Sequence, residues 1–166
     1  MSDTVLPVIP ECKPWIQTWT GLAFNLEAPT PEMFELEDIF HALARINRFT
    51  GHTKGPHGYS VGQHSCHAHD LALTLEHKRA ALLHDGAEAY YGDVTAPLKV
   101  LLPGYRVLEQ AAMRIMAAKF SFTYPLPAEV KHRDMQMLQI ERKALMQHHV
   151  GNWNVDGVEA PDFGID

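Results

Sequence analysis

Apolar residues recur every three or four positions in several long stretches of the chain, a spacing that gathers them on one face of an α-helix. The first stretch predicts a helix over residues 35–49, and a strong stripe predicts another over residues 105–120. A third stretch, preceded by two prolines, predicts a long helix over residues 128–147. The pattern therefore favours an all-α fold.

Two further helices are predicted in the middle of the chain. Ser60, followed three residues later by Gln63, has the pattern of a capping box, so a helix should begin at Ser60 and run toward Leu75. Another helix is expected over residues 78–91, because Gly92 is suited to a tight helix exit.

Other parts of the chain lack a helical pattern. Residues 1–14 contain three prolines and are expected to form an extended lead-in. Short alternating segments that flank Gly21 predict a small β-hairpin over residues 15–26. Pro97 and the Leu-Pro-Gly of residues 102–104 predict a connection before the helix over residues 105–120.

The chain of 166 residues has the length of one globular domain and is too short for two domains with full cores. We therefore expect a single domain: a lead-in with a possible hairpin (1–34), a helical core (35–147) and an irregular tail (148–166). Apolar residues make up 46% of the chain and charged residues 20%, a mix that can bury such a core.

Charge and cysteine content narrow the class of partner. With 14 Lys and Arg against 20 Asp and Glu, the net charge of -6 gives no general attraction to a nucleic-acid polymer or an acidic membrane. Small phosphates remain candidates because they need only a local positive site. Two cysteines cannot form a disulfide framework, no apolar run approaches the roughly 20 residues of a membrane span, and no leader pattern is visible. We expect a cytoplasmic protein.

The chain contains 11 histidines, about three times the number in a chain of average composition. Many of them fall in one stretch of the chain, namely His52, His57, His64, His67, His69, His77 and His84. A surface accident could explain some of them. So many candidate ligands in one stretch nevertheless favour a search for a metal site.

The dipeptide His-Asp occurs twice, and its context separates the two copies. His84-Asp85 closes the apolar run AALL, where a buried ionisable pair is costly unless a metal or a partner holds it. His69-Asp70 lies midway along a polar-faced helix and is expected to be solvated. The nitrogen and oxygen donors of such a pair suit Zn, Mn, Co, Ni or Mg.

Two residues on neighbouring helices could complete a site around His84-Asp85. His64 lies in the first turns of the preceding predicted helix, and Asp134 lies inside the last one. Ligands from three helices can converge in the interior of a bundle. The alternative for Asp134 is an exposed acid beside Lys131 and Arg133.

Three segments, DIFHALARINRFTGH, YSVGQHS and AALLHDGAEAYYGDVTAPLK, resemble the HD-domain phosphohydrolases. The resemblance is closest to bacterial and prophage HD-domain 5′-deoxynucleotidases and extends to phage dNTP (dATP) triphosphohydrolases. The later segment VKHRDMQMLQIERKAL resembles the helix that carries the last metal ligand of that family. Together these segments cover most of residues 38–146 and imply an HD-domain helical bundle.

The resemblance implies a divalent metal (Zn, Co, Mn, Ni or Mg) bound in an H…HD…D pattern. The implied ligands are His64, His84, Asp85 and Asp134. Neighbouring histidines, His52, His57 and His67, are rivals for the first position, but only His64 matches the motif.

Two acidic residues are implied to act in catalysis. Glu88 lies three residues after Asp85 and would be a general acid or base for the water that attacks phosphorus. Asp93 matches a family aspartate near the nucleotide and the reacting water. The alternatives are a helix carboxylate paired with a basic residue for Glu88 and a capping or turn residue for Asp93.

Arg48 and Phe49 match an arginine–aromatic pair of the deoxynucleotidases. The arginine fork suits a phosphate, and the aromatic ring crowds the sugar and disfavours a 2′-hydroxyl. Many relatives have Trp there, so Phe49 implies a weaker deoxyribose preference; its alternative role is the last apolar residue of the first helix. Lys99, Lys54 and His57 are further candidate phosphate contacts, or else solvated surface charges.

The resemblance thus implies a metal-dependent enzyme that hydrolyses 2′-deoxynucleoside 5′-monophosphates to deoxynucleosides and phosphate. A dNTP triphosphohydrolase is the alternative, and Lys54, Lys99 and Arg106 could line the longer basic channel that it needs. A nucleotide- or metal-binding module without turnover is disfavoured by Glu88, because a binder needs no proton-transfer group. We expect a small-molecule nucleotide substrate and a homo-oligomer.

Overall fold

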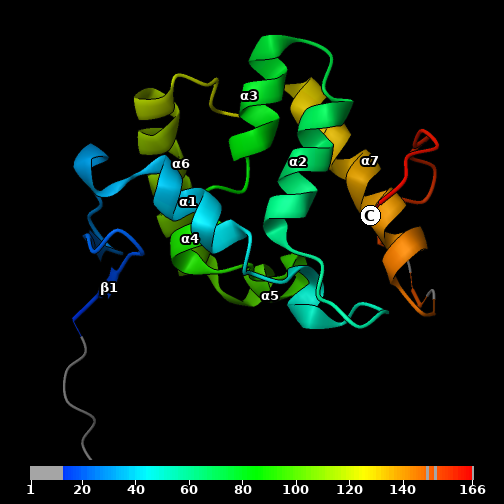
Figure 1. Cartoon of the computed structure of the whole chain (residues 1–166), viewed down its shortest axis with the longest axis horizontal. Coiled ribbons are helices and arrows are strands. Elements are labelled where there is room, and N and C mark those ends of the chain that lie inside the picture. The colour runs from blue at the N-terminus through cyan, green and yellow to red at the C-terminus, as the bar shows by residue number, and fades with distance from the viewer. Residues whose placement is uncertain (1–12, 149, 152, 166) are drawn as a thin grey trace, which may run out of the picture.

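The computed structural model describes residues 13–148, 150–151 and 153–165 and is mainly helical, as predicted (Figure 1). Its elements in chain order are β1 (Trp15–Gln17), β2 (Ala23–Asn25), the 3-10 turn η1 (Pro31–Met33), α1 (Leu36–Leu43), the 3-10 turn η2 (Arg48–Gly51), α2 (Val61–Leu71), α3 (Leu75–Leu83), α4 (Glu88–Tyr91), α5 (Ala96–Leu101), α6 (Pro103–Phe120) and α7 (Ala128–Leu145). The expected extended lead-in falls mostly on residues 1–12, which lie outside the described part.

The predicted N-terminal hairpin is confirmed. Strands β1 and β2 pair antiparallel, with Trp15 opposite Asn25, and Gly21 in the connection has a φ of 91° that suits glycine. The buried carboxylate of Asp38 on α1 accepts hydrogen bonds from the backbone N–H and the hydroxyl of Thr20, at 2.7 and 2.8 Å. These two bonds hold the hairpin connection against the first helix.

The capping box at the start of α2 is also confirmed. The Ser60 hydroxyl accepts a hydrogen bond from the N–H of Gln63 at 3.1 Å, and the Gln63 side chain accepts one from the N–H of Ser60 at 2.9 Å. The helix ends at Leu71, before the predicted Leu75, because Thr74 caps the next helix through its side chain.

The first predicted helix is shorter than the apolar spacing indicated. Helix α1 ends at Leu43, and Asn47 is already extended, where it forms an isolated antiparallel bridge with Ser60. Phe49 and Thr50 then have positive φ values of 55° and 54°. The prediction of one helix over residues 35–49 was therefore wrong, because tertiary pairing overrides the spacing after Leu43.

The helix predicted over residues 78–91 is in fact two helices. Helix α3 ends at Leu83 and α4 begins at Glu88, so the second His-Asp dipeptide lies in the turn between them. The connection predicted from Pro97 to Gly104 also contains a helix, α5, with Pro97 in its first turn, and the last two residues of the connection already belong to α6. Proline is tolerated in a first helical turn because the N–H that it lacks has no partner there.

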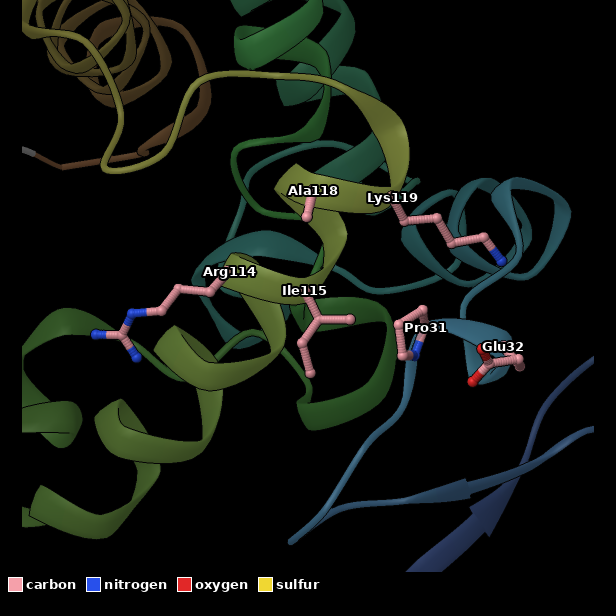
Figure 2. Close-up of a pocket in the computed structure, with 6 residues that line it drawn as sticks. All are labelled: Pro31, Glu32, Arg114, Ile115, Ala118 and Lys119. Atoms are coloured by element: carbon pink, nitrogen blue, oxygen red, sulfur yellow. The ribbon is translucent and has the colours of Figure 1, made fainter.

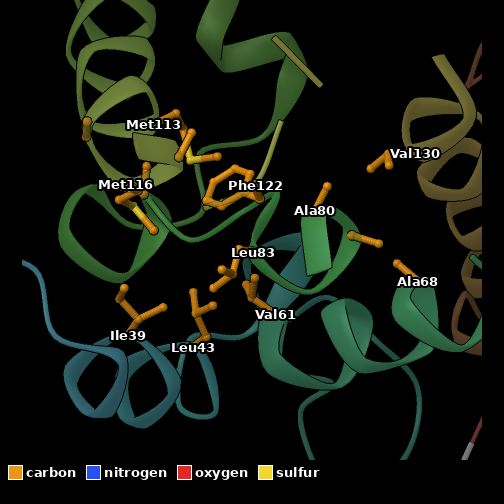
Figure 3. Packing of buried hydrophobic residues seen from close by; sticks show 14 of the residues in the cluster. Ile39, Leu43, Val61, Ala68, Ala80, Leu83, Met113, Met116, Phe122 and Val130 are labelled. Carbon is orange, nitrogen blue, oxygen red and sulfur yellow. The ribbon is translucent and has the colours of Figure 1, made fainter. Parts of the chain in front are cut away.

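Helix α2 packs against α3 and α7, which also contact each other, and α1 packs against α4 (Figure 1). The core between them contains Ile39 and Leu43 of α1, Val61 of α2, Leu83 of α3 and Met116 of α6 (Figure 3). The meeting of α2, α3 and α7 brings side chains from three separate parts of the sequence into one place.

The described part of the C-terminal tail has no helix or strand, but it packs on the domain. Val155 is buried, and the side chain of Gln136 on α7 donates a hydrogen bond to the carbonyl of Glu159 at 2.7 Å. Arg142, also on α7, pairs with Asp156 at 2.5 Å. The tail is thus tied to the outer side of α7 at several points.

A hollow of about 620 Å³ lies between η1 and α6 (Figure 2). Its lining residues are Pro31, Glu32, Arg114, Ile115, Ala118 and Lys119. They include none of the candidate site residues selected from the sequence. As for membranes, none of the described helices combines the length and the apolar character needed for a crossing.

Candidate metal centre

Side chains from three helical segments converge where α2, α3 and α7 meet. His64 comes from the first turns of α2, His84 and Asp85 from the turn after α3, and Asp134 from α7. One ligand atom from each of His64, His84 and Asp134 lies within 4.8 Å of the other two, so this group could hold a metal ion. The structure thus brings together the residues that the H…HD…D pattern indicated.

The separations between the donor atoms fit a shared cation. His64 Nε2 lies 3.1 Å from His84 Nε2 and 3.2 Å from Asp134 Oδ1. Asp85 Oδ2 lies 3.2 Å from His84 Nε2 and 3.6 Å from His64 Nε2, and His84 Nε2 lies 3.6 Å from Asp134 Oδ1. Ligands bound at about 2.1 Å with octahedral or tetrahedral angles are about 3.0 to 3.4 Å apart.

The hydrogen bonds of Nδ1 in the two imidazoles determine which nitrogen faces the centre. His64 Nδ1 lies 2.6 Å from Glu141 Oε1, and His84 Nδ1 lies 2.6 Å from the carbonyl oxygen of Ala81. Both oxygens are acceptors, so each Nδ1 carries the proton and donates it. In neutral rings the two Nε2 atoms then carry lone pairs that face each other and repel. A metal ion bound by both atoms would remove this repulsion.

The charges around the histidines favour positive charge at this point. Burial opposes protonation of His64, yet Glu141 and Asp134 outweigh it and raise the pKa of the ring. Burial likewise opposes protonation of His84, whose pKa nevertheless rises well above the usual value because of Asp85 and Asp134. The carboxylates thus create a site that attracts a cation, whether a proton or a metal.

Asp134 connects the centre to solvent. Its side chain is 43% exposed, whereas that of His64 is fully buried. The sequence left open whether Asp134 was only an exposed acid beside basic residues, but Arg133 pairs instead with Glu129 at 2.8 Å. A partly exposed donor leaves the centre reachable by water or substrate, as a catalytic metal site requires.

The rival histidines lie elsewhere. His52 and His57 are exposed in the loop before α2, and within the described chain no hydrogen bond or ion pair joins either of them to the centre. His67 instead stacks on the ring of Tyr59, with centroids 6.1 Å apart, and Phe163 meets its edge at 5.3 Å. The candidate phosphate contact at His57 therefore stays a prediction without structural support.

Glu88 lies one turn after Asp85 and is 4% exposed. Lys99 Nζ lies 3.5 Å from its Oε1 and 2.6 Å from Glu109 Oε1, while Glu88 Oε2 is buried without a hydrogen-bond partner among the described residues. Burial, with the charges of Asp85 and Asp93, raises the pKa of Glu88 well above its usual value. A buried carboxyl group with a raised pKa is suited to hold and release a proton.

Arg48 lies in η2 and points toward the centre. Its Nη1 is 3.4 Å from Asp85 Oδ2, and its Nη2 is 3.0 Å from Glu141 Oε2. Glu141 on α7 is fully buried and was not among the residues selected from the sequence. The spacing could have indicated it, because Glu141 follows Asp134 by seven residues and so lies two turns along the same helix face.

Phe49 lies beside Arg48, and Asp93 is linked to it by electrostatics. The Arg48 guanidinium carbon is 5.2 Å from the ring centroid of Phe49, whose other neighbour is Trp153 at 5.7 Å. Since α1 ends at residue 43, Phe49 is not the last apolar residue of that helix. Burial raises the pKa of Asp93 and the charge of Arg48 opposes this, so Asp93 lies within electrostatic reach of the site.

Fold and centre together define a mainly helical protein with a buried histidine–aspartate group able to hold a metal. No model of a known protein family matches the chain. The chain is 34% identical over 150 residues to the uncharacterized protein YfdR of Escherichia coli K12, which covers 90% of the chain and 83% of YfdR. It is also 34% identical over 124 residues to the uncharacterized protein RCAP_rcc00048 of Rhodobacter capsulatus, covering 70% of the chain and 63% of that protein. The chain therefore belongs to the family of YfdR.

Proposed function

We propose that the protein is a metal-dependent phosphohydrolase of the HD-domain type, which converts 2′-deoxynucleoside 5′-monophosphates to deoxynucleosides and phosphate. The observation that carries this proposal is the convergence of four histidine and aspartate side chains beside the buried Glu88 and Arg48. A purely structural metal site needs only its ligands. A proton carrier and an anion-binding guanidinium beside the ligands support hydrolysis of a phosphate ester.

The donor set suits Zn, Mn, Co, Ni or Mg, held by His64, His84, Asp85 and Asp134. Such an ion, when bound, supplies a Lewis acid for a phosphate oxygen and lowers the pKa of water. Arg48 donates to phosphate oxygens from the edge of the site that it shares with Asp85.

Glu88 carries the proton in this proposal. Water adds to phosphorus and loses a proton, while the bond from phosphorus to the 5′ oxygen breaks and that oxygen gains a proton. Oε2 of Glu88 has no hydrogen-bond partner among the described residues, and this atom and the raised pKa of the side chain suit Glu88 to take part in the transfer. Asp93 interacts electrostatically with Arg48 and Glu88, so it could act on the same water or on the nucleotide.

The pairing of the nearby cations favours a monophosphate. Arg48 forms an ion pair with Glu141, and Lys99 lies within ion-pair distance of Glu88 and Glu109. The positive charges of Arg48 and Lys99 are thus largely balanced within the protein. A triphosphate adds negative charge that needs further positive donors.

Cleavage of a dNTP to the deoxynucleoside and triphosphate is the second candidate. Lys54 and Arg106 favour it, because both are exposed and, within the described chain, no ion pair engages either side chain. These two residues would have to bind the outer phosphates.

The test starts from protein stripped with a chelator and reloaded with each of the five metals. Products from dAMP, AMP and dATP are separated by HPLC. We expect deoxyadenosine and phosphate from dAMP, whereas triphosphate released from dATP would favour the second candidate. Absence of product with every metal and every substrate would overturn the proposal and favour a binding module without turnover.

A further inference from the structure

The carboxylate of Glu141 lies between two groups that the proposed function uses for different tasks. One oxygen, Oε1, lies 2.6 Å from Nδ1 of His64, a candidate metal ligand. The other, Oε2, lies 3.0 Å from Nη2 and 3.2 Å from Nε of Arg48, the candidate phosphate donor. Each oxygen of one side chain thus serves a different part of the site.

The burial of Glu141 makes these contacts consequential. Its side chain is fully buried, as is that of His64, and the Arg48 side chain is 12% exposed. Water cannot replace a partner that moves away from a carboxylate at such a position, so the three groups must keep their mutual orientation.

We propose that Glu141 is a positioning residue that couples metal binding to phosphate binding, an inference that rests on the proposed function. Glu141 accepts a hydrogen bond from Nδ1–H of His64, so the lone pair of Nε2 is directed at Asp134 and His84. By accepting from Nη2 and Nε of Arg48, it holds the remaining nitrogen, Nη1, toward Asp85.

Glu141 also places a negative charge between the Arg48 guanidinium and the candidate metal ligand His64. The guanidinium of Arg48 lies 3.4 Å from Oδ2 of Asp85, itself a candidate metal ligand, so its positive charge is close to the centre. A metal ion held by Asp85 and its neighbours would be repelled by this charge. The buried Glu141 carboxylate between Arg48 and His64 offsets this repulsion. Loss of its negative charge should therefore lower the affinity for the metal even where the shape of the side chain is kept.

The variant Glu141→Gln tests this, because the amide keeps the size and removes the charge. Its NH₂ group must also face a donor, either His64 Nδ1–H or the Arg48 fork. We expect the affinity for Co²⁺, followed by the visible absorption of the bound ion and by competition with a chelator, to fall about 10- to 100-fold. We expect the affinity of the Co²⁺-saturated variant for inorganic phosphate, measured by calorimetry, to fall as well.

Two further variants separate positioning from stability. Asp38→Asn removes another buried carboxylate with two hydrogen bonds, outside the site, and should leave Co²⁺ and phosphate affinity at the wild-type values despite a lower Tm. Glu141→Asp keeps the charge on a shorter side chain and should recover part of the Co²⁺ affinity. This variant also serves if Glu141→Gln does not fold.

The outcomes decide between the two roles. A folded Glu141→Gln variant with wild-type Co²⁺ and phosphate affinity would overturn the inference, and so would weaker Co²⁺ binding with unchanged phosphate binding at saturation. Parallel weakening of both ligands supports it even where the wild-type protein hydrolyses no nucleotide, because neither measurement depends on turnover. Failure of the proposed function is thus distinguishable from failure of the inference.

Discussion

The two His-Asp dipeptides have the same sequence and opposite environments. His84 is 8% exposed, and its Nε2 faces Asp85 and the more distant Asp134, from another helix. In the other copy the side chains of His69 and Asp70 are 35% and 61% exposed, and their contact of 2.9 Å is with each other. The expectation that this copy is solvated is confirmed.

The difference lies in what each imidazole does with its Nδ1. In His84 this atom donates to the carbonyl of Ala81, near the end of α3, and so leaves Nε2 free to face the centre. In His69 the same atom is engaged by the neighbouring Asp70. A His-Asp dipeptide therefore becomes a candidate ligand pair where the end of a helix accepts the hydrogen bond of Nδ1 and the facing helices place further donor atoms near Nε2.

Removing the carboxylate of each copy gives the largest expected contrast. Asp85→Ala should abolish metal binding and hydrolysis together. It deletes a metal donor and removes the carboxylate that pairs with Nη1 of Arg48. Asp70→Ala should keep both properties. Metal content after dialysis and product formation from dAMP measure the two effects. Similar losses in both variants would mean that the buried pair is not special.

A smaller loss is expected from a change at Glu88, the proposed proton carrier beside the buried pair. Glu88→Gln should keep the metal and bind nucleotide but lower kcat by about 10² to 10⁴, the usual contribution of a general acid or base. Glu109→Gln is the matched control, because Glu109 is the other partner of Lys99. An unchanged kcat in the metal-loaded Glu88 variant would remove this residue from the mechanism.

Sugar selection should change less. Apolar walls reject an added hydroxyl only by roughly 10² or less, so we expect a modest preference of the wild-type protein for dAMP over AMP. Phe49→Ala should reduce this ratio of kcat/KM toward one, while Phe40→Ala, an exposed phenylalanine of α1, should not. An unchanged ratio with a lower Tm would make Phe49 a packing residue.

The smallest effect concerns stability against pH in the metal-free protein. The pKa of Glu88 is raised in the folded state by burial first and then by Asp85 and Asp93, so the folded chain binds this proton more tightly than the unfolded chain. Stability is then lost as pH rises above about 4.5. Glu88→Gln should raise Tm at pH 8 and change it little at pH 4. Equal Tm differences at both pH values would contradict this.

Local patterns were enough to predict much of the fold. The hairpin around Gly21, the capped start of α2 and the long helices α6 and α7 follow from signals within each segment. The end of α1 does not, because no glycine or proline stands between Leu43 and Asn47 and the bridge to Ser60 is a long-range contact. Propensity cannot anticipate such a pairing.

The candidate site was predictable to a similar extent. His64, His84, Asp85 and Asp134 were selected from the sequence, and the structure brings them together. Glu141 was missed because an acid near the end of a long helix is usually solvated. In its buried position Glu141 contacts Arg48 and His64, which precede it by 93 and 77 residues in the sequence.

The backbone beside Arg48 has a consequence for protein engineering. Phe49 and Thr50 both adopt the left-handed conformation, which is unfavourable for an L-residue by roughly 1–2 kcal/mol and especially so for a β-branched one. A stability screen would therefore select Thr50→Gly as a gain. The same change would free the segment that holds the guanidinium, so under the proposed function a more thermostable variant would bind phosphate less well. At this one position, a substitution that improves thermal stability would thus be expected to lower turnover.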